Sequence, residues 1–281
     1  MNKTKSINIP WFQIFKYLIY GLLAFDVYLF FVEEFSATSF RYAKGLDFNE
    51  IIVAYSGTID TAAWVILLIV FELETWVIDD DKLKGGLKWF LNLISLFSYS
   101  IIVYSFYAYV QKYIWALSIH EIQNVTDACG YIGQSWLIEL DHFVEITQEN
   151  CSTLATSSQL YGIPDQNIIT DLESLKLTKN LALTDVLNSA AWLLVVLVLE
   201  IDVWLQLKHK LKGGLYLTNK IIKFSAYTLL LLAAVYWGFT GQFLDFWDAF
   251  LWIVAFLFIE MNLFKWHEET EEEDKIKESI F

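Results

Sequence analysis

Six long apolar runs constrain the fold of this chain more than any other feature of its sequence. Each run holds or approaches the ~20 residues that an α-helix needs to cross the hydrocarbon core of a bilayer. The hydrophobic share of 56% and the mean hydropathy of +0.44 exceed what a water-soluble domain of 281 residues would show. The sequence therefore predicts an all-α polytopic membrane protein with six transmembrane helices, at residues 17–32, 51–78, 89–110, 184–207, 221–239 and 246–264.

The distribution of positive charge predicts the orientation of these spans. Most of the 19 Lys and Arg residues fall in segments that share one side of the membrane with the N-terminus. Short cytoplasmic segments are enriched in Lys and Arg in membrane proteins. We therefore expect both termini in the cytoplasm, the long 111–183 segment outside it, and an integral location in the plasma or inner membrane.

An internal repeat groups the six spans into pairs. The segment AAWVILLIVFELETWVIDDDKLKGGL from Ala62 aligns without gaps with AAWLLVVLVLEIDVWLQLKHKLKGGL from Ala190. A shorter copy, DAFLWIVAFLFIEMNLF, begins at Asp248. Each copy has Asp or Asn, then Trp four residues later, then Glu, in an outside-to-inside span. The repeat predicts three pseudo-repeated helical hairpins, and such repeats are common in transport folds.

Four regions follow from this arrangement. Residues 1–110 hold transmembrane helices 1–3, residues 111–183 form an acidic extracytoplasmic helical cap, residues 184–266 hold helices 4–6, and residues 267–281 are an acidic cytoplasmic tail. Within the cap, QSWLIELDHFVEIT has the apolar spacing of an amphipathic helix. A second helix is expected to begin at Asp171 and to lead into the fourth span.

The two cysteines, Cys129 and Cys151, both lie in the cap region. An oxidising compartment would allow them to pair, and the predicted topology places them on that side. The alternative is two free buried thiols. A zinc site is not expected, because the chain has no Cys-x-x-Cys pair and no histidines at ligand spacing.

Acidic residues recur at one level of the inward-running spans, and they are candidate ion or proton stations. On a helical wheel Glu74 shares a stripe with Asp60 and Trp64, whereas Glu72 points sideways. The neighbouring acids therefore cannot form one claw, and a shared site must be assembled between helices. An inner acidic ring would draw its carboxylates from the repeated positions Glu72, Glu74, Glu200, Asp202 and Glu260.

A purely structural role for these inner acids is the competing interpretation. They lie near the membrane interface, where they could reach the lysines at 82–84 and 208–212 and lock the cytoplasmic turns. Ionised groups deeper in a bilayer are costly, so they need a partner or a function.

Asp26 and Asp60 are the remaining candidate stations. Asp26 lies near the middle of the first span, at a depth where no span supplies a Lys or Arg. Its carboxyl must be protonated, hydrated, or shared with a hydroxyl such as that of Tyr99, Tyr104 or Tyr227. Asp60 belongs to the polar outer stretch of the second span, where it could line an external vestibule or simply begin the helix.

Missing motifs narrow the expected function. The spans contain no His for haem ligation and no mid-span Lys for a Schiff base, and the chain has no P-loop, His-Glu-x-x-His or Gly-x-Ser-x-Gly motif. No enzyme activity, cofactor, metal centre or nucleic-acid partner is expected. We expect a cation- or proton-linked transporter or channel in the lipid bilayer. The alternative is a non-catalytic subunit or scaffold that docks a membrane-protein partner or a second copy of itself.

Overall fold

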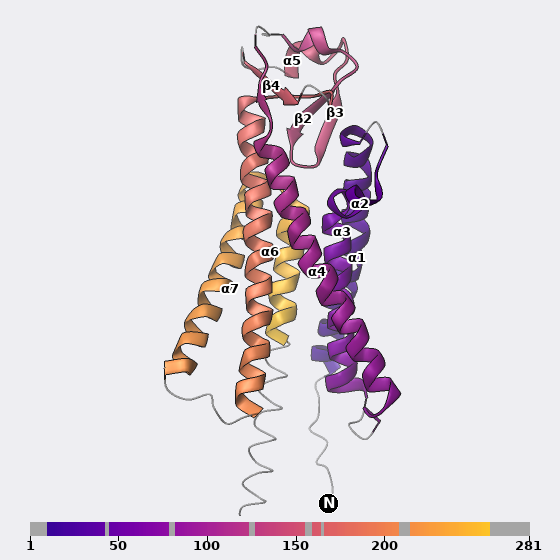
Figure 1. Cartoon of the computed structure of the whole chain (residues 1–281), viewed down its shortest axis with the longest axis vertical. Coiled ribbons are helices and arrows are strands. Elements are labelled where there is room, and N and C mark those ends of the chain that lie inside the picture. Colours follow the sequence, from indigo (N-terminus) through magenta and orange to yellow (C-terminus); the bar gives the residue numbers. More distant parts are fainter. Residues whose placement is uncertain are drawn as a thin grey trace, which may run out of the picture.

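The computed structural model describes residues 10–42, 45–78, 82–123, 127–154, 159–163, 166–207 and 214–258. Long helices run side by side along the longest axis, and a small cap stands at one end of them (Figure 1). Within the bundle α3 packs against α1 and α4, and α6 packs against α4 and α7. The fold is therefore mostly helical, as predicted, with the cap as the exception.

Within the described residues, five long helices and two shorter ones make up the bundle. Residues 243–258 form a further helix, drawn in yellow in Figure 1. A π-helical turn, η1 (Leu73–Val77), continues α3. The bounds are α1 Pro10–Arg41, α2 Phe48–Ala54, α3 Ser56–Glu72, α4 Gly86–Leu117, α6 Leu172–Leu207 and α7 Gly214–Thr240.

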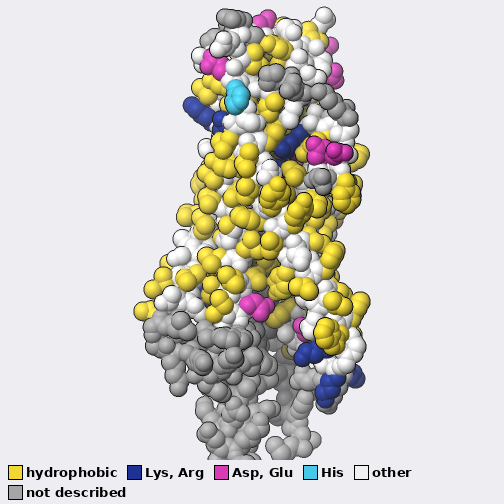
Figure 2. Space-filling model, viewed as in Figure 1, with side chains coloured by type: hydrophobic (Ala, Val, Ile, Leu, Met, Phe, Trp, Pro, Cys, Tyr) yellow, Lys and Arg dark blue, Asp and Glu magenta, His cyan; other side chains and the backbone are white. Residues whose placement is uncertain are grey.

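Five of these helices are long and apolar enough to cross a membrane, namely α1, α3 with η1, α4, α6 and α7. Their outer surfaces carry many exposed large apolar side chains, such as Phe97, Leu197 and Phe224. Figure 2 shows a wide apolar band around the middle of the molecule, with most charged side chains near its ends. Such a surface is compatible with an integral membrane protein. The sixth predicted span, 246–264, extends beyond the described residues.

The cap contains a five-stranded sheet, so the prediction of an all-helical cap is wrong. The strands lie in the order β1-β4-β5-β2-β3, and all neighbours are antiparallel except β2 and β5. Their bounds are β1 His120–Glu121, β2 Ser135–Glu139, β3 His142–Glu145, β4 Leu160–Ile163 and β5 Ile168–Asp171.

The predicted amphipathic helix is the β2–β3 hairpin. Trp136 pairs with Val144 and Leu137 with Phe143, and the register shifts between Leu137 and Glu139. This irregularity breaks the strict alternation of a strand, so the buried residues fall at spacings that resemble a helical period. Asp141, in the turn, has a φ of 61°, a left-handed conformation that Asp tolerates better than most residues.

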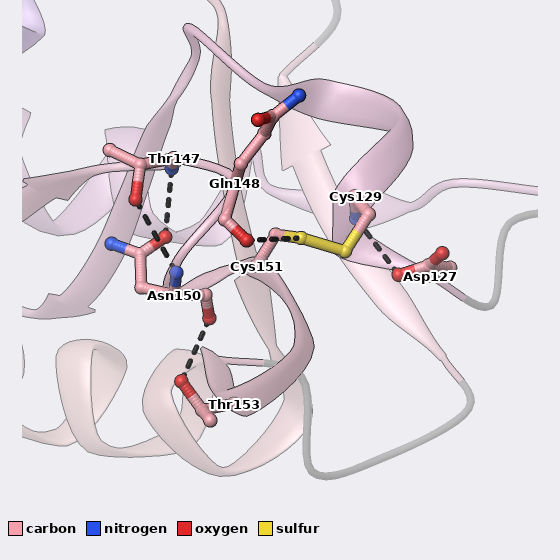
Figure 3. Close-up of a disulfide and its surroundings, with 7 residues drawn as sticks. All are labelled: Asp127, Cys129, Thr147, Gln148, Asn150, Cys151 and Thr153. Carbon is pink, nitrogen blue, oxygen red and sulfur yellow. Dashed lines mark hydrogen bonds between the residues drawn. A yellow bond between two sulfur atoms is a disulfide. The ribbon is translucent and has the colours of Figure 1, made fainter.

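The predicted disulfide between Cys129 and Cys151 is present (Figure 3). Cys129 lies in the 3₁₀ helix η2 (Ala128–Tyr131), where its backbone N–H donates to the Asp127 carboxylate at 2.8 Å. Cys151 begins the short helix α5 (Cys151–Leu154). The bond therefore joins two segments beside the sheet that have little regular structure of their own.

The helix expected after Asp171 is also confirmed. It is α6, which runs without a break from the cap into the bundle. The Asp171 carboxylate accepts a hydrogen bond from the backbone N–H of Ser174 at 2.7 Å, which satisfies a free donor at the start of the helix. The cap is thus rigidly continuous with one membrane-length helix.

Candidate functional site

A polar cavity, here called the cap-side cavity, lies among α1, α3, α4, α6 and the 243–258 helix, below the β2–β3 turn. The space open to the centres of water molecules is about 90 Å³. One water needs about 10–15 Å³ of such space, so the cavity holds several waters or a small molecule. The lining carboxylates, from described residues, are Glu33, Glu34, Asp60, Asp141, Asp185, Asp245 and Asp248.

Glu34 is one of two lining carboxylates that form ion pairs with described residues. It is buried, and it accepts hydrogen bonds from the backbone N–H groups of Gly57 at 2.8 Å and Thr58 at 3.0 Å. The Thr58 hydroxyl donates to it at 2.7 Å. These donors belong to the first turn of α3, where the helix dipole favours a negative charge. Lys112 of α4 adds an ion pair at 3.3 Å, so Glu34 joins three helices.

Asp141 is the second lining carboxylate that forms ion pairs, and it reaches the cavity from the cap. Its Oδ2 atom accepts from Lys112 Nζ at 2.6 Å, and its Oδ1 atom lies 3.8 Å from Arg41 Nη1. The Arg41 guanidinium stacks over the Trp115 ring, 4.1 Å from its centroid. The left-handed turn of the hairpin is therefore tied to α1 and α4 by charge.

The other five carboxylates form no ion pair within the part of the chain that the structure describes. Asp60 accepts from the Tyr109 hydroxyl at 3.4 Å, and Asp248 accepts from the Trp252 indole N–H at 3.1 Å. Lys112 is the only basic residue among the described lining residues, and Glu34 and Asp141 already use its charge. The cavity therefore has an excess of acidic groups that a cation or protons can balance.

Three tryptophans from the repeated motif meet at the floor of the cap-side cavity. The ring centroid of Trp64 lies 6.1 Å from that of Trp192 and 6.1 Å from that of Trp252. Phe256 completes this group, 4.5 Å from Trp192, and we call the four residues the aromatic cluster. The repeat positions four residues earlier, Asp60, Asn188 and Asp248, also line the cavity.

A second cavity, the far-side cavity, lies beyond the aromatic cluster, away from the cap. Its volume is about 480 Å³, and its wall is mostly apolar. Trp64, Trp252 and Phe256 line both cavities. The aromatic cluster is therefore a partition between an acidic space near the cap and a wider space toward the other end of the bundle.

Glu72 and Glu74 point apart, as the helical wheel predicts, but Glu200, which aligns with Glu72 in the repeat, lies with Glu74. Glu74 and Glu200, from α3 with η1 and from α6, line the far-side cavity together, and Tyr99 donates to Glu200 at 3.3 Å. Glu72 points toward α1, away from both cavities. Glu260 and the side chain of Asp202 lie outside the described residues, so the structure brings together two members of the predicted ring.

Glu72 is buried against α1 and does not line either cavity. Its Oε1 atom lies 2.5 Å from Lys16 Nζ, and the Tyr17 hydroxyl donates to the same atom at 3.0 Å. The Lys16 ammonium also lies over the Trp76 ring, 5.3 Å from its centroid. Glu72 therefore pairs with Lys16 of α1, and not with the lysines at 82–84 that the structural interpretation named.

Asp26 is fully buried in α1, and neither of its carboxylate oxygens has a hydrogen-bond partner among the described residues. The hydroxyl-sharing alternative is therefore wrong, and Tyr99 instead serves Glu200. Asp26 lies outside the lining of both cavities. A protonated or hydrated carboxyl remains the interpretation that agrees with these surroundings.

Seven charged cavity residues were missed in the sequence as candidate stations: Glu33, Glu34, Lys112, Asp141, Asp185, Asp245 and Asp248. Asp141 lies in the cap, and the other six lie near the border of a predicted apolar run, where each resembles an ordinary interfacial residue. α1 and α4 continue well past those borders, which places Glu33, Glu34 and Lys112 on the helix walls. The signal in the sequence was that charged residues occur at the same end, next to the outside segments, of four separate predicted spans.

Comparisons with known protein families, with characterised proteins and with solved structures found no match for this chain. The site is therefore interpreted from its own geometry. Buried acidic walls concentrate cations, and an intramembrane carboxylate without a partner marks a functional site by default.

Proposed function

We propose that this protein is an integral membrane protein that moves a cation or protons across the bilayer. The path runs from the cap-side cavity, through the aromatic cluster, to the far-side cavity. One observation carries the proposal: two cavities in one helical bundle share the same aromatic wall. The cap faces outward and both termini face the cytoplasm, in agreement with the distribution of Lys and Arg.

The cap-side cavity is the external station of this path. Its carboxylates without ion pairs lower the energy of a cation that leaves bulk water, and they act strongly in surroundings of low dielectric constant. Glu34 and Asp141 keep the mouth in shape, because Lys112 and Arg41 already neutralise them. Asp60 and Asp248 lie directly above the tryptophans and would hand a cation to the aromatic cluster.

The aromatic cluster is the barrier of the path. Bulky rings that touch exclude water, while their faces still attract a cation. From Asp60 to Glu74 the chain advances 14 positions, about 21 Å at the rise of an α-helix. The two stations are thus separated by most of the hydrocarbon thickness, and the rings must move for a cation to pass. A transporter or a gated channel both meet this requirement.

Three helical hairpins arranged around the path account for the repeat. In this proposal the second helix of each hairpin supplies one Asp or Asn and one Trp to the cap-side cavity. The supporting contacts are those of Trp64 with Trp192 and with Trp252. Three equivalent helices that converge on one axis are a simple way to build a central path.

Flux in proteoliposomes tests the proposal. Purified protein is reconstituted, and H⁺, Na⁺ and K⁺ fluxes are followed with internal indicator dyes under each gradient. Asp60→Asn and Glu74→Gln should each reduce flux at least about tenfold, because an ion–carboxylate contact is worth more than 1.4 kcal/mol in this setting. Glu173→Gln, on the exposed first turn of α6, is the matched control and should leave flux unchanged.

The absence of ion flux would contradict the proposal. Well-folded wild-type protein that gives no flux of any of these ions, at any pH or gradient, would exclude ion transport. The alternative, a non-catalytic subunit or scaffold, draws support from the Lys16–Glu72 pair, in which an intramembrane acid serves helix packing. Stoichiometric co-purification of a membrane-protein partner, together with absence of flux, would favour it.

A further inference from the structure

The lining of the cap-side cavity combines three features that together select a class of ligand. The carboxylates are spread around the wall, the floor is made of indole rings, and several buried polar atoms lack partners. We propose that this cavity binds a short linear organic diamine. The inference rests on the proposed cation transport and names the class of cation that the cap-side station accepts.

The spacing of the carboxylates is the first argument. Glu33, Asp60, Asp185 and Asp248 come from α1, α3, α6 and the 243–258 helix, on different sides of the cavity. Among the described residues, no three His, Cys, Asp or Glu side chains converge closely enough to hold a metal ion. Acidic groups that surround a space without converging match a ligand whose positive charges are separated along a chain.

The aromatic floor is the second argument. Ammonium groups bind over indole faces, and Trp gives the strongest such interaction of the aromatic residues. The Trp252 indole N–H is held by Asp248, which fixes the ring. Methylene groups of an alkyl amine also pack against Trp64 and Trp192, a contact that a hydrated alkali-metal ion cannot make.

The buried polar atoms without partners are the third argument, and they are independent of the acidic charge. Asp60 Oδ1 and Asn188 Oδ1 are buried acceptors that have no donor within the described part of the chain. Ammonium groups are donors that can complete these two acceptors, whereas the indole N–H of Trp237, only 4% exposed on the cavity wall and without an acceptor among the described residues, needs a bound water. A buried polar group without a partner costs about 1–3 kcal/mol, so these atoms favour a ligand or bound water that can complete them.

Size is compatible with a short chain. The cavity has space for the centres of about six to nine water-sized groups, from its 90 Å³ and the 10–15 Å³ that each needs. A four-carbon diamine has six non-hydrogen atoms. Its two ammonium groups can reach opposite walls while its methylene groups lie over the tryptophans.

Binding to the full-length protein in detergent, at fixed ionic strength, tests the inference. The probes are 1,4-diaminobutane and spermidine, with butylamine, 1,4-butanediol, NaCl and MgCl₂ as comparisons, and the readout is isothermal titration calorimetry. We expect saturable binding of 1,4-diaminobutane, weaker binding of butylamine and of spermidine, whose ten non-hydrogen atoms exceed the space, and none of the neutral diol. Asp60→Asn and Asp248→Asn should each weaken diamine binding at least about tenfold.

Three variants localise the effect. Trp64→Leu should weaken the diamine more than it weakens Na⁺, because it removes the indole face. Glu74→Gln, in the far-side cavity, and Glu173→Gln, on the surface, should leave diamine affinity unchanged. Size-exclusion profiles and thermal unfolding show whether each variant is folded. If Asp60→Asn is not folded, Asp60→Glu takes its place; this variant keeps the carboxylate and should retain binding.

The results separate this inference from the proposed function. Diamine binding without flux of any cation would keep the ligand class and exclude transport. Flux of H⁺, Na⁺ or K⁺ without saturable diamine binding would keep transport and overturn the ligand class. Diamine binding that Asp60→Asn and Asp248→Asn leave unchanged would also overturn it, because the amine would then bind elsewhere.

Discussion

Lys112 and Asp141 form an ion pair of 2.6 Å that joins the cap-side end of α4 to the tip of the cap hairpin. The same ammonium group lies 3.3 Å from Glu34, which holds the first turn of α3. One buried lysine thus connects α1, α3, α4 and the cap at the mouth of the acidic cavity. Its removal would leave the buried Glu34 carboxylate without its cation and Asp141 with Arg41 alone.

Lys112→Met should therefore lower the free energy of unfolding by about 3–5 kcal/mol, the usual cost of breaking a buried pair from one side. The double variant Lys112→Met with Glu34→Gln should recover part of the loss, because less uncompensated charge stays buried. Lys112→Arg keeps the charge and is the control. Chemical unfolding in detergent measures all three. A double variant no more stable than Lys112→Met would contradict a charge-based role.

Gly57 is required by the close approach of the Glu34 carboxylate to the start of α3. A Cβ atom there would lie 3.2 Å from Glu34 Oε1 and 3.2 Å from the Phe30 ring. Gly57→Ala should thus destabilise the protein by about 1–3 kcal/mol through overpacking. Gly21→Ala in α1 has open space around its Cβ and should be neutral or stabilising by up to about 1 kcal/mol. Equal melting temperatures of the two variants would argue against this packing.

Trp64 lies at the centre of the aromatic cluster, in contact with Trp192, Trp252 and Phe256. Trp64→Ala should join the two cavities and raise passive cation leak in proteoliposomes, because the ring that contacts the other three members of the partition is removed. Trp76→Ala, on the exposed surface, is the matched control. Leak unchanged from wild type, in folded Trp64→Ala protein, would place the barrier elsewhere.

The disulfide should stabilise the cap and leave the bundle largely unaffected. The loop between Cys129 and Cys151 spans 22 residues, and cross-linking such a loop is worth about 3 kcal/mol in the chain-entropy model. The double variant Cys129→Ser with Cys151→Ser should speed hydrogen exchange in β2, β3 and β4. Amides of α3 and α4 should keep their protection. Cap exchange equal to wild type would show that the sheet is stable without the bond.

Local signals in the sequence predicted several features correctly. Apolar runs predicted the long helices, since a chain in a bilayer must satisfy its backbone hydrogen bonds within each segment. The 3.6-residue period predicted that Glu72 and Glu74 point apart. Cysteine placement predicted the disulfide. The β2–β3 hairpin was mistaken for a helix, because a register shift imitates helical spacing and the partner strand β5 is remote in sequence.

The sequence by itself determined which residues are available: long apolar helices, a repeated Asp or Asn with Trp, and acids at both ends of the spans. The tertiary structure alone decided which of them meet. Glu72 pairs with Lys16, whereas Glu74 shares a cavity with Glu200. Acids at the helix ends, which resemble ordinary interfacial residues in the sequence, converge on one buried space near the cap. The physical reason is that a helical period fixes directions within one helix, while distances between helices depend on how the whole bundle packs.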